Sequence, residues 1–365
     1  MAIEYEHAVI HHLRKESKKP IEKPILRDAT LNCESKAVRK LIDGVINLYG
    51  TKDNNAIFGT FAESPEEKGF FPASFEKFRS SNQSEQQFID MTVTAMRSLQ
   101  SKARDVNFAS GGYILFASYT SDNKPFLLIA MIKQRDGIQL NDNLEPIGIQ
   151  ELDLNKLHQA ARINIERYLL HGETQDIDEK EQLSYLSFVS PKTNQSASGY
   201  FIKALGCSGG VAASRATDTA CREMANFFQS NSALTPKKRE LKSAVFDYLR
   251  ECAEEKQNAT IGDLAALARR YFPATYSDDE KNELESALIS ELNSEDTQLP
   301  GEFRVHLATV NKHAKTKLKS SNWQLSFEKH SLGDDENAEI WFDKKNNRIV
   351  INELSDEIRR TLLEQ

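Results

Sequence analysis

The sequence predicts an α+β protein with a mixed sheet and helices in a larger N-terminal domain, then a helical segment and a small C-terminal antiparallel β unit. Strand-like apolar runs and helix-like apolar spacings are mixed in the first half of the chain. Helical patterns fill the stretch that begins near residue 235, and short alternating segments return near the C-terminal end. We therefore expect an N-terminal domain at 1–230, a helical segment at 235–300 and a C-terminal unit at 301–365.

Two amphipathic helices and a central β-hairpin are expected first in the N-terminal domain. Residues 36–49 and 85–103 carry apolar side chains at three- and four-residue intervals, which is typical of a helix with one buried face. Two aromatic and branched runs follow at 111–119 and 126–132, and a polar turn at 121–125 separates them. Runs of this kind around a short turn predict a hairpin in the centre of a sheet.

One more strand and two helices are expected in the rest of this domain. The alternating residues 183–189 indicate the strand, and 198–206 and 211–229 indicate the helices, which the Gly209-Gly210 pair separates. Glycines ahead of a helix can offer backbone N–H groups to an anion. A break between two packed helices explains the same glycines, and we favour that interpretation.

Thr235-Pro236 marks the start of the helical segment, because a capping side chain followed by proline is a common helix start. Three helices are expected from there, at 236–254, 260–271 and 278–292. The C-terminal unit is then expected to contain short strands and a closing helix. The strands are predicted at 323–327, 339–342 and 348–351, and the helix at 355–364.

The net charge of −7 argues against a generic DNA-binding domain, because such domains are usually basic. The charges are segregated, however. Residues 1–40 carry nine Lys and Arg against six Asp and Glu, residues 251–300 carry four against twelve, and residues 301–330 carry six against two. An acidic chain with this distribution can still present a basic face.

The composition favours a globular protein of the cytoplasm. No apolar stretch approaches the roughly 18 to 20 residues of a membrane-spanning helix, and the first residues lack the layout of a signal peptide. The cysteines Cys33, Cys207, Cys221 and Cys252 show no paired spacing, so we expect free thiols in a reducing compartment. We expect no contact with a membrane.

The sequence contains no recognisable catalytic motif. No GxxxxGK[ST] or HExxH string occurs, and no motif places a recognisable base for Cys207 or Ser208. His11 and His12 could ligate a metal, but neighbours on one helix point about 100° apart, and we favour surface histidines. Carboxylate clusters such as Asp278-Asp279-Glu280 are best explained as solvated loops. We therefore expect no enzymatic activity, no cofactor and no metal.

Residues 304–319 offer the strongest candidate surface for nucleic acid. If this segment is helical, Lys312, Lys315 and Lys319 share one face. Lysines bind phosphates as point charges without reading bases, so binding here is expected to be non-specific and salt-dependent. A solvated lysine-rich face explains the same pattern, and that alternative stays open. The candidate DNA-binding residues are Lys312, Lys315, Lys317, Lys319, Arg304, Lys237, Lys238, Arg239, Lys15, Lys18 and Lys19.

Eight short motifs occur in an order that resembles a known family. They are Ile25-Leu26-Arg27-Asp28, Ser110 to Phe116, Leu127 to Ala130, Leu152-Asp153-Leu154, Ala161-Arg162-Ile163, Tyr185 to Phe188, Phe201 to Ser208 and Ile340 to Asp343. In this order they are similar to the NdpA/YejK family of bacterial nucleoid-associated proteins. The chain departs from the family pattern around 191–197 and 293–303, where it is longer.

The resemblance implies a DNA-binding protein of the nucleoid that has no known enzymatic activity and is associated with type II topoisomerases. We therefore expect non-specific binding of double-stranded DNA, a role in bacterial chromosome organisation and modulation of a type II topoisomerase. A homodimer would add avidity to weak basic faces. Three alternatives stay open: a protein-interaction module that docks a basic partner through 251–300, a phage-defence component on the same fold and, less favoured, a metal-dependent nuclease.

Overall fold

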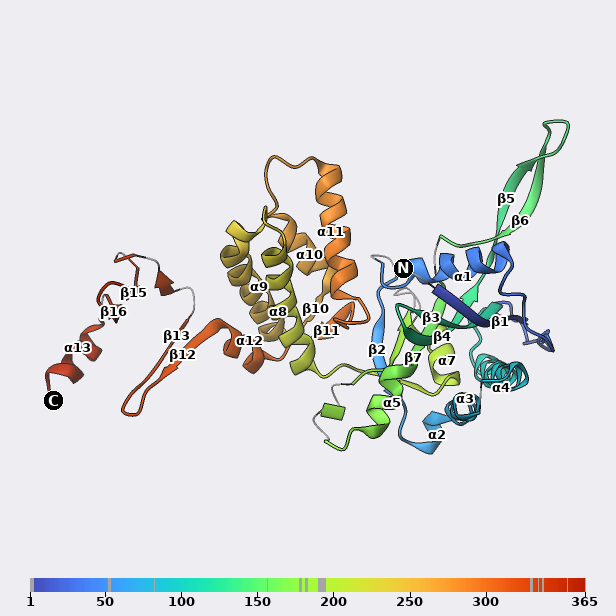
Figure 1. Cartoon of the computed structure of the whole chain (residues 1–365), viewed down its shortest axis with the longest axis horizontal. Coiled ribbons are helices and arrows are strands. Elements are labelled where there is room, and N and C mark those ends of the chain that lie inside the picture. The colour runs from blue at the N-terminus through green and yellow to red at the C-terminus, as the bar shows by residue number, and fades with distance from the viewer. Residues whose placement is uncertain are drawn as a thin grey trace.

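The molecule has three parts along its longest axis: a sheet covered by helices, a group of helices, and a C-terminal set of short strands (Figure 1). The predicted α+β fold class is confirmed, because a large antiparallel sheet with helices packed on it is followed by a group of helices and by small separate sheets. The computed structural model describes residues 3–51, 54–81, 83–155, 157–176, 179–180, 183–189, 195–328, 331–333, 335–336, 338–352 and 354–364. Residues 191–194, in one of the segments where the chain departs from the family pattern, lie outside these ranges.

A seven-stranded antiparallel sheet forms the centre of the first part, in the order β1-β3-β4-β7-β8-β2-β9. The strands are β1 (Ile3–Leu13), β2 (Ile57–Phe61), β3 (Gly112–Ser121), β4 (Lys124–Ile132), β7 (Gln159–Asn164), β8 (Leu186–Val189) and β9 (Cys207–Gly209). The predicted central hairpin is confirmed as β3 and β4, which pair from Tyr113–Ile132 to Ser121–Lys124. Asp122 and Asn123 adopt positive φ in the turn, as two-residue hairpin turns require.

Helices cover both faces of this sheet. One buried cluster joins the sheet to α3 (Phe71–Ser80), α4 (Glu85–Arg104) and α7 (Gln195–Ala204), and a second joins its other face to α1 (Lys36–Leu48). The helices predicted at 36–49 and 85–103 are therefore confirmed as α1 and α4. Two further helices complete this part, α2 (Pro65–Lys68) and α5 (Ile165–Glu173).

His11 and His12 lie on strand β1 and not on a helix, which corrects the geometry assumed for them. Strand neighbours point to opposite faces. The His11 side chain is buried, where its Nδ1 accepts from the backbone N–H of Arg27 at 3.1 Å and its Nε2 lies 2.9 Å from the Thr92 hydroxyl. The His12 ring stacks on Tyr113, with centroids 4.5 Å apart. The two rings therefore cannot share one metal ion.

Burial, assisted by the charge of Arg27, lowers the pKa of His11 to about 4. The unfolded chain binds a proton near the ordinary histidine pKa of about 6.5, whereas the folded chain resists protonation until about pH 4. The free energy of unfolding is therefore expected to fall as the pH drops through this window. Urea unfolding at pH 7 and pH 5 should show a smaller pH effect in His11→Gln than in the unchanged chain. An equal pH effect in both would contradict a buried neutral His11.

A β-ribbon projects from the sheet at the end of β4 (Figure 1). Its strands β5 (Gln134–Leu140) and β6 (Pro146–Leu152) pair in register from Gln134–Leu152 to Leu140–Pro146. The ribbon shows exposed apolar side chains at Ile138 and Leu144. No strand was predicted here, because the segment is too polar to stand out as a buried run.

The second part has a separate hydrophobic core that extends from Ala216 to Ala314. It contains α8 (Ala213–Ser230), the 3₁₀ turn η2 (Thr235–Lys237), α9 (Lys238–Glu254), α10 (Ile261–Arg269), α11 (Asp278–Leu292), α12 (Leu307–Ala314) and the short strands β10 (Asn258–Thr260) and β11 (Glu302–Arg304). The helices predicted at 236–254, 260–271 and 278–292 are confirmed as α9, α10 and α11. Hydrophobic contacts place α8 with these helices and not with the sheet that precedes it.

Polar side chains that follow α11 connect the helical part to the sheet through hydrogen bonds and an ion pair. The Asn293 amide oxygen accepts from the Ala56 N–H at 2.6 Å, and its amide nitrogen donates to the Ala56 carbonyl at 3.0 Å. Glu295 forms an ion pair with Arg162 of β7, at 2.6 Å. The Arg162 guanidinium also lies over the rings of Tyr49 and Phe126, at 4.5 and 5.1 Å. Part of the acidic block at 251–300 therefore binds within the chain itself.

Of the segment 304–319, which was considered as one helix, only Leu307–Ala314 is helical. The helix α12 ends at Ala314, and Lys315–Lys319 form strand β12, which pairs with β13 (Gln324–Glu328). Thr316 and Leu318 are half-buried between exposed lysines, so burial follows a period of two and not of 3.6. The predicted strand at 323–327 is confirmed as β13, and the pairing of the two strands decides the conformation of the lysine segment.

The C-terminal end consists of a three-stranded sheet and a helix (Figure 1). The elements are β14 (Leu332–Gly333), β15 (Ile340–Asp343), β16 (Arg348–Ile351) and α13 (Asp356–Leu363). The hairpin predicted from 339–342 and 348–351 is confirmed, as is the closing helix. Asp343 accepts hydrogen bonds from Asn346 in the turn and from Arg348. Among the described residues, no helix is both long and apolar enough to cross a membrane.

Candidate nucleic-acid interface

The lysines of β12 form a row on one face of the β12–β13 hairpin. Lys315, Lys317 and Lys319 alternate with Thr316 and Leu318, and all three are exposed. Strand residues two apart point to the same face and lie about 6.8 Å apart along the strand. Lys315 and Lys319 are four residues apart, so the row of three lysines spans about 14 Å along the strand.

The partner strand leaves this row available to a ligand. Lys317 lies opposite Ser326, and Lys319 lies opposite Gln324, so two of the three lysines have uncharged neighbours across the hairpin. Lys315 lies opposite Glu328. Within the described ranges of the chain, these lysines and Lys312 of α12 form no ion pair. The opposite face carries Leu325 and Phe327 beside Thr316 and Leu318 and is mainly apolar.

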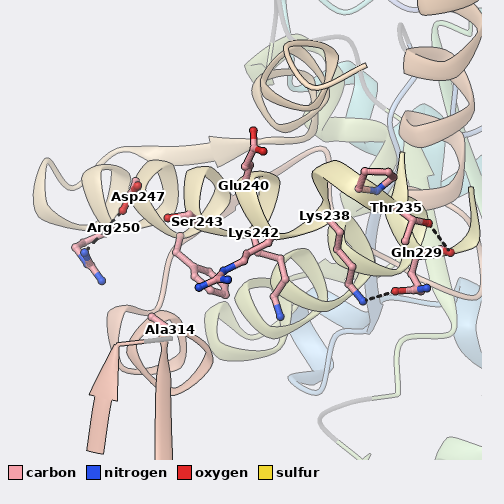
Figure 2. A pocket seen from close by; sticks show the side chains of 12 residues that line it. Gln229, Thr235, Lys238, Glu240, Lys242, Ser243, Asp247, Arg250 and Ala314 are labelled. Carbon is pink, nitrogen blue, oxygen red and sulfur yellow. Dashed lines mark hydrogen bonds and ion pairs between the residues drawn. The ribbon is translucent and has the colours of Figure 1, made fainter. Parts of the chain in front are cut away.

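A basic groove adjoins the start of this hairpin. It has a volume of about 570 Å³ and lies on α9, where Ala314, the last residue of α12, also lines it. Figure 2 shows the side chains of Lys238, Lys242 and Arg250 extending from one side of α9, whereas Glu240 points away from them. Because β12 begins directly after Ala314, the groove and the lysine row are continuous along the chain.

Arg250 was not among the residues predicted for DNA binding, and Lys242 belongs to the same basic run as the predicted Lys237, Lys238 and Arg239. Lys242 and Arg250 line the groove with Lys238, and spacings of four and eight residues bring all three to one side of a helix. This spacing is visible within the predicted helix 236–254, so the sequence contained the signal. Arg250 forms an ion pair with Asp247 at 3.9 Å, and Asp247 and Glu240 line the groove together with the four basic residues Lys238, Arg239, Lys242 and Arg250.

The other predicted residues near α9 are engaged within the protein. Lys237 forms an ion pair with Glu240 at 2.7 Å, and Lys238 donates to the Gln229 side chain at 2.9 Å. Arg239 donates to the backbone carbonyl of Leu332. These bonds are at the surface, so phosphate can compete for Lys238, but Lys237 already has a carboxylate partner.

The N-terminal lysines do not join this surface. Lys15 is only 8% exposed, and its amine donates to the carbonyls of Glu16, Lys19 and Asn107 at 2.9, 2.7 and 3.3 Å. Lys18 lies over the ring of Phe108, and Lys19 forms an ion pair with Glu16. All three follow β1, which Figure 1 shows in the first part of the molecule, well apart from α9 and α12.

Arg304 lies in a different place, a cleft of about 850 Å³ between the sheet edge and β11. Lys102 and Lys203 also line this cleft, but Glu66, Glu67 and Glu302 balance their charge. Gly209 contributes to its wall as part of strand β9, the last strand of the sheet. Gly206 has φ +64°, and a Cβ there would lie 2.0 Å from the Lys68 carbonyl oxygen, so this glycine serves the close packing of two backbones.

Among the residues that the structure describes, no group of three or more His, Cys, Asp or Glu side chains could hold a metal ion. Burial raises the pKa of the Cys207 thiol, which keeps it protonated and weakly nucleophilic.

Comparisons with known proteins give a consistent family. The family described as nucleoid-associated protein YejK matches residues 9–359. The chain is 27% identical over 360 residues to a nucleoid-associated protein of Pseudomonas aeruginosa (strain UCBPP-PA14), covering 98% of this chain and 96% of the relative.

Two further relatives carry the same description. A nucleoid-associated protein of Azotobacter vinelandii is 27% identical over 359 residues, covering 98% of this chain and 97% of the relative. One of Shewanella denitrificans is 25% identical over 267 residues, covering 73% and 74%. Because the family matches nearly the whole length, the chain belongs to the family of nucleoid-associated protein YejK.

Proposed function

We propose that the protein binds double-stranded DNA without sequence preference, through the lysine row of β12 and the basic groove on α9. The observation that carries this proposal is the row of Lys315, Lys317 and Lys319, which is exposed on one face of a hairpin and forms no ion pair with the described residues, although Glu328 lies opposite Lys315. Family membership supports it, because the relatives are described as nucleoid-associated. The cytoplasm of a bacterium, at the nucleoid, is the corresponding location.

The spacing of the row suits a phosphate backbone. Neighbouring phosphates of one DNA strand lie further apart than their rise of about 3.4 Å along the helix axis, because the backbone also winds around that axis. Lysines about 6.8 Å apart along a strand have a spacing of the same order as neighbouring phosphates. Lysines contribute point charges and do not recognise base edges in the way that paired Arg or Asn contacts do. The surface is therefore suited to affinity without base recognition. It also explains how a chain with a net charge of −7 can bind DNA, since the positive charge is concentrated locally.

A salt titration tests this proposal. Fluorescence anisotropy with two duplexes of unrelated sequence is expected to give equal affinities, and log K should fall linearly with log salt. Contact of Lys312, Lys315, Lys317 and Lys319 with four phosphates predicts a slope of about −3.6 from these residues alone. A slope near zero, or affinities that differ tenfold between the duplexes, would contradict non-specific phosphate binding.

A second proposal concerns a protein partner, a type II topoisomerase subunit that the protein would modulate. Helix α11 exposes Asp279 and Glu283, four residues apart on one side, and neither is used by the ion pairs that fasten the two parts together. A basic surface on the partner would complement them. A pull-down of purified topoisomerase subunits should lose signal with D279K/E283K and keep it with the β12 lysine variants described below. Unchanged capture by D279K/E283K would exclude this face.

A further inference from the structure

The C-terminal sheet and helix carry an apolar face that the described chain covers only in part, since Ile340 is buried there and its neighbours are exposed. Strands β15 and β16 pair Ile340 with Ile351 and Phe342 with Ile349, so these four side chains share one face. Phe342, Ile349 and Ile351 remain 43%, 36% and 41% exposed. Helix α13 adds exposed Ile358, Leu362 and Leu363, and it buries none of its residues. Exposed apolar side chains of this kind are typical of an interaction surface.

These elements are too short to be stable without a partner. Helices shorter than about 12 residues are marginal in water, and α13 has eight. The strands β15 and β16 have four residues each, and small sheets need a covered apolar face for stability. Contact with a second apolar surface would bury the exposed apolar side chains of this end of the chain and so stabilise it.

The outer edge of β16 indicates that the second surface is the edge of another β-strand. β16 is an outer strand of the three-stranded sheet. The Asn352 N–H donates to the Glu339 carbonyl at 2.8 Å, which directs the backbone groups of Asn352 towards β15. Since direction alternates along an antiparallel strand, the N–H and C=O of Ile349 and Ile351 point outwards, away from β15. β16 contains neither proline nor glycine, and its single charged residue, Arg348, points to the face opposite Ile349 and Ile351.

We infer that two copies of this chain associate through β16, by antiparallel pairing across a two-fold axis at Val350. This register places Ile349 of one copy opposite Ile351 of the other, so that all four outward N–H and C=O groups of each strand find partners. Arg348 then lies opposite Asn352, and no like charges meet. The apolar faces of the two sheets then become one continuous face. A closed two-fold contact of this kind is the commonest oligomeric symmetry.

This association does not depend on DNA binding, but it has a consequence for it. Each copy carries its lysine hairpin β12–β13 immediately before the C-terminal sheet. Pairing at β16 therefore links two lysine rows in one particle, and linked weak sites bind with greater overall affinity than separate ones.

Cysteine cross-linking tests the register directly. Val350 is at a non-hydrogen-bonded position of the inferred pairing, where facing Cα atoms are about 4.5 Å apart, within reach of a disulfide. Val350→Cys is expected to form a covalent dimer under mild oxidation. The matched control Arg348→Cys is on the same strand and face, but its symmetry mate would lie about 14 Å away, so it should remain monomeric on a non-reducing gel. Equal cross-linking of V350C, R348C and the unchanged chain with its own four cysteines would overturn the inference.

Sedimentation velocity supplies a second measurement that does not need a disulfide. The unchanged chain is expected to sediment as a dimer of a 41.3 kDa chain. I349K/I351K places lysines opposite lysines and should give a monomer, whereas I349K/I351E places opposite charges across the axis and should restore the dimer. Equal circular dichroism spectra establish that both variants are folded. A monomeric unchanged chain, or a monomeric I349K/I351E variant, would overturn the inference.

The exposed ribbon β5–β6 provides the control for other apolar surfaces. Ile138 is 80% exposed there, and Ile138→Lys should leave the dimer intact. Loss of the dimer in Ile138→Lys would assign the contact to the ribbon and would overturn pairing at β16.

Discussion

The variant K315E/K317E/K319E is expected to lower DNA affinity at low salt by at least about a hundredfold. Each lysine that contacts a phosphate contributes about 0.9 to the slope of log K against log salt, so the slope should fall by about three. Reversal also adds repulsion where attraction was lost. The loss should be equal on duplexes of unrelated sequence, because lysines of this kind read charge and not bases. Anisotropy titrations at several salt concentrations measure both quantities.

The chain offers a matched control for this variant. Lys23, Lys36 and Lys40 are exposed lysines of the first part, and K23E/K36E/K40E lowers the net charge by the same amount. If the local row binds DNA, the control keeps most of the affinity. If both variants lose affinity equally, the effect is one of overall charge and the β12 row is the wrong surface.

The second large effect is expected at the buried ion pair between Arg162 and Glu295. Both side chains are only 15% exposed, and Glu295→Ala would leave the Arg162 guanidinium buried without its carboxylate. Breaking such a pair from one side costs about 3–5 kcal/mol of unfolding free energy, whereas replacing both partners by apolar residues is often neutral. We therefore expect a marked loss of stability in Glu295→Ala and recovery in R162M/E295L, measured by urea unfolding.

The neighbouring pair Lys124–Asp296 is the control for this experiment. Its atoms are 2.8 Å apart, but the Asp296 side chain is 74% exposed. Exposed ion pairs contribute about 0–1 kcal/mol, so Asp296→Ala should change stability little. A loss in Asp296→Ala as large as in Glu295→Ala would mean that burial does not distinguish the two pairs.

Much of the fold could be predicted because its signals are local. The apolar periodicity of 36–49 and 85–103 depends on neighbours three and four residues away, and both segments form the expected helices. The hairpin β3–β4 was predictable for the same reason, since two apolar runs and their turn lie within one short stretch. The strands β1 and β7 were not predicted, because they mix polar and apolar residues and acquire their burial only within the sheet.

The candidate site shows where local patterns stop being sufficient. The lysines at 312, 315 and 319 fit a helical spacing, and those at 315, 317 and 319 fit a strand spacing equally well. Pairing with β13 selects the strand, because its register places Leu325 opposite Leu318 and Phe327 opposite Thr316. The choice depends on residues outside the lysine segment, so periodicity within it could not decide.

By itself the sequence determined which residues are basic, where most helices begin and end, and the order of motifs that indicates the family. Only the tertiary structure decided which basic residues face solvent together. It buries Lys15 against three carbonyls, pairs Lys237 with Glu240 and aligns Lys315, Lys317 and Lys319 on an exposed face. It also joins Arg162 to Glu295 across more than a hundred residues of chain. The physical reason is that burial and charge pairing depend on contacts between distant segments. Composition and residue spacing reflect only which residues are present and which lie close together in the sequence.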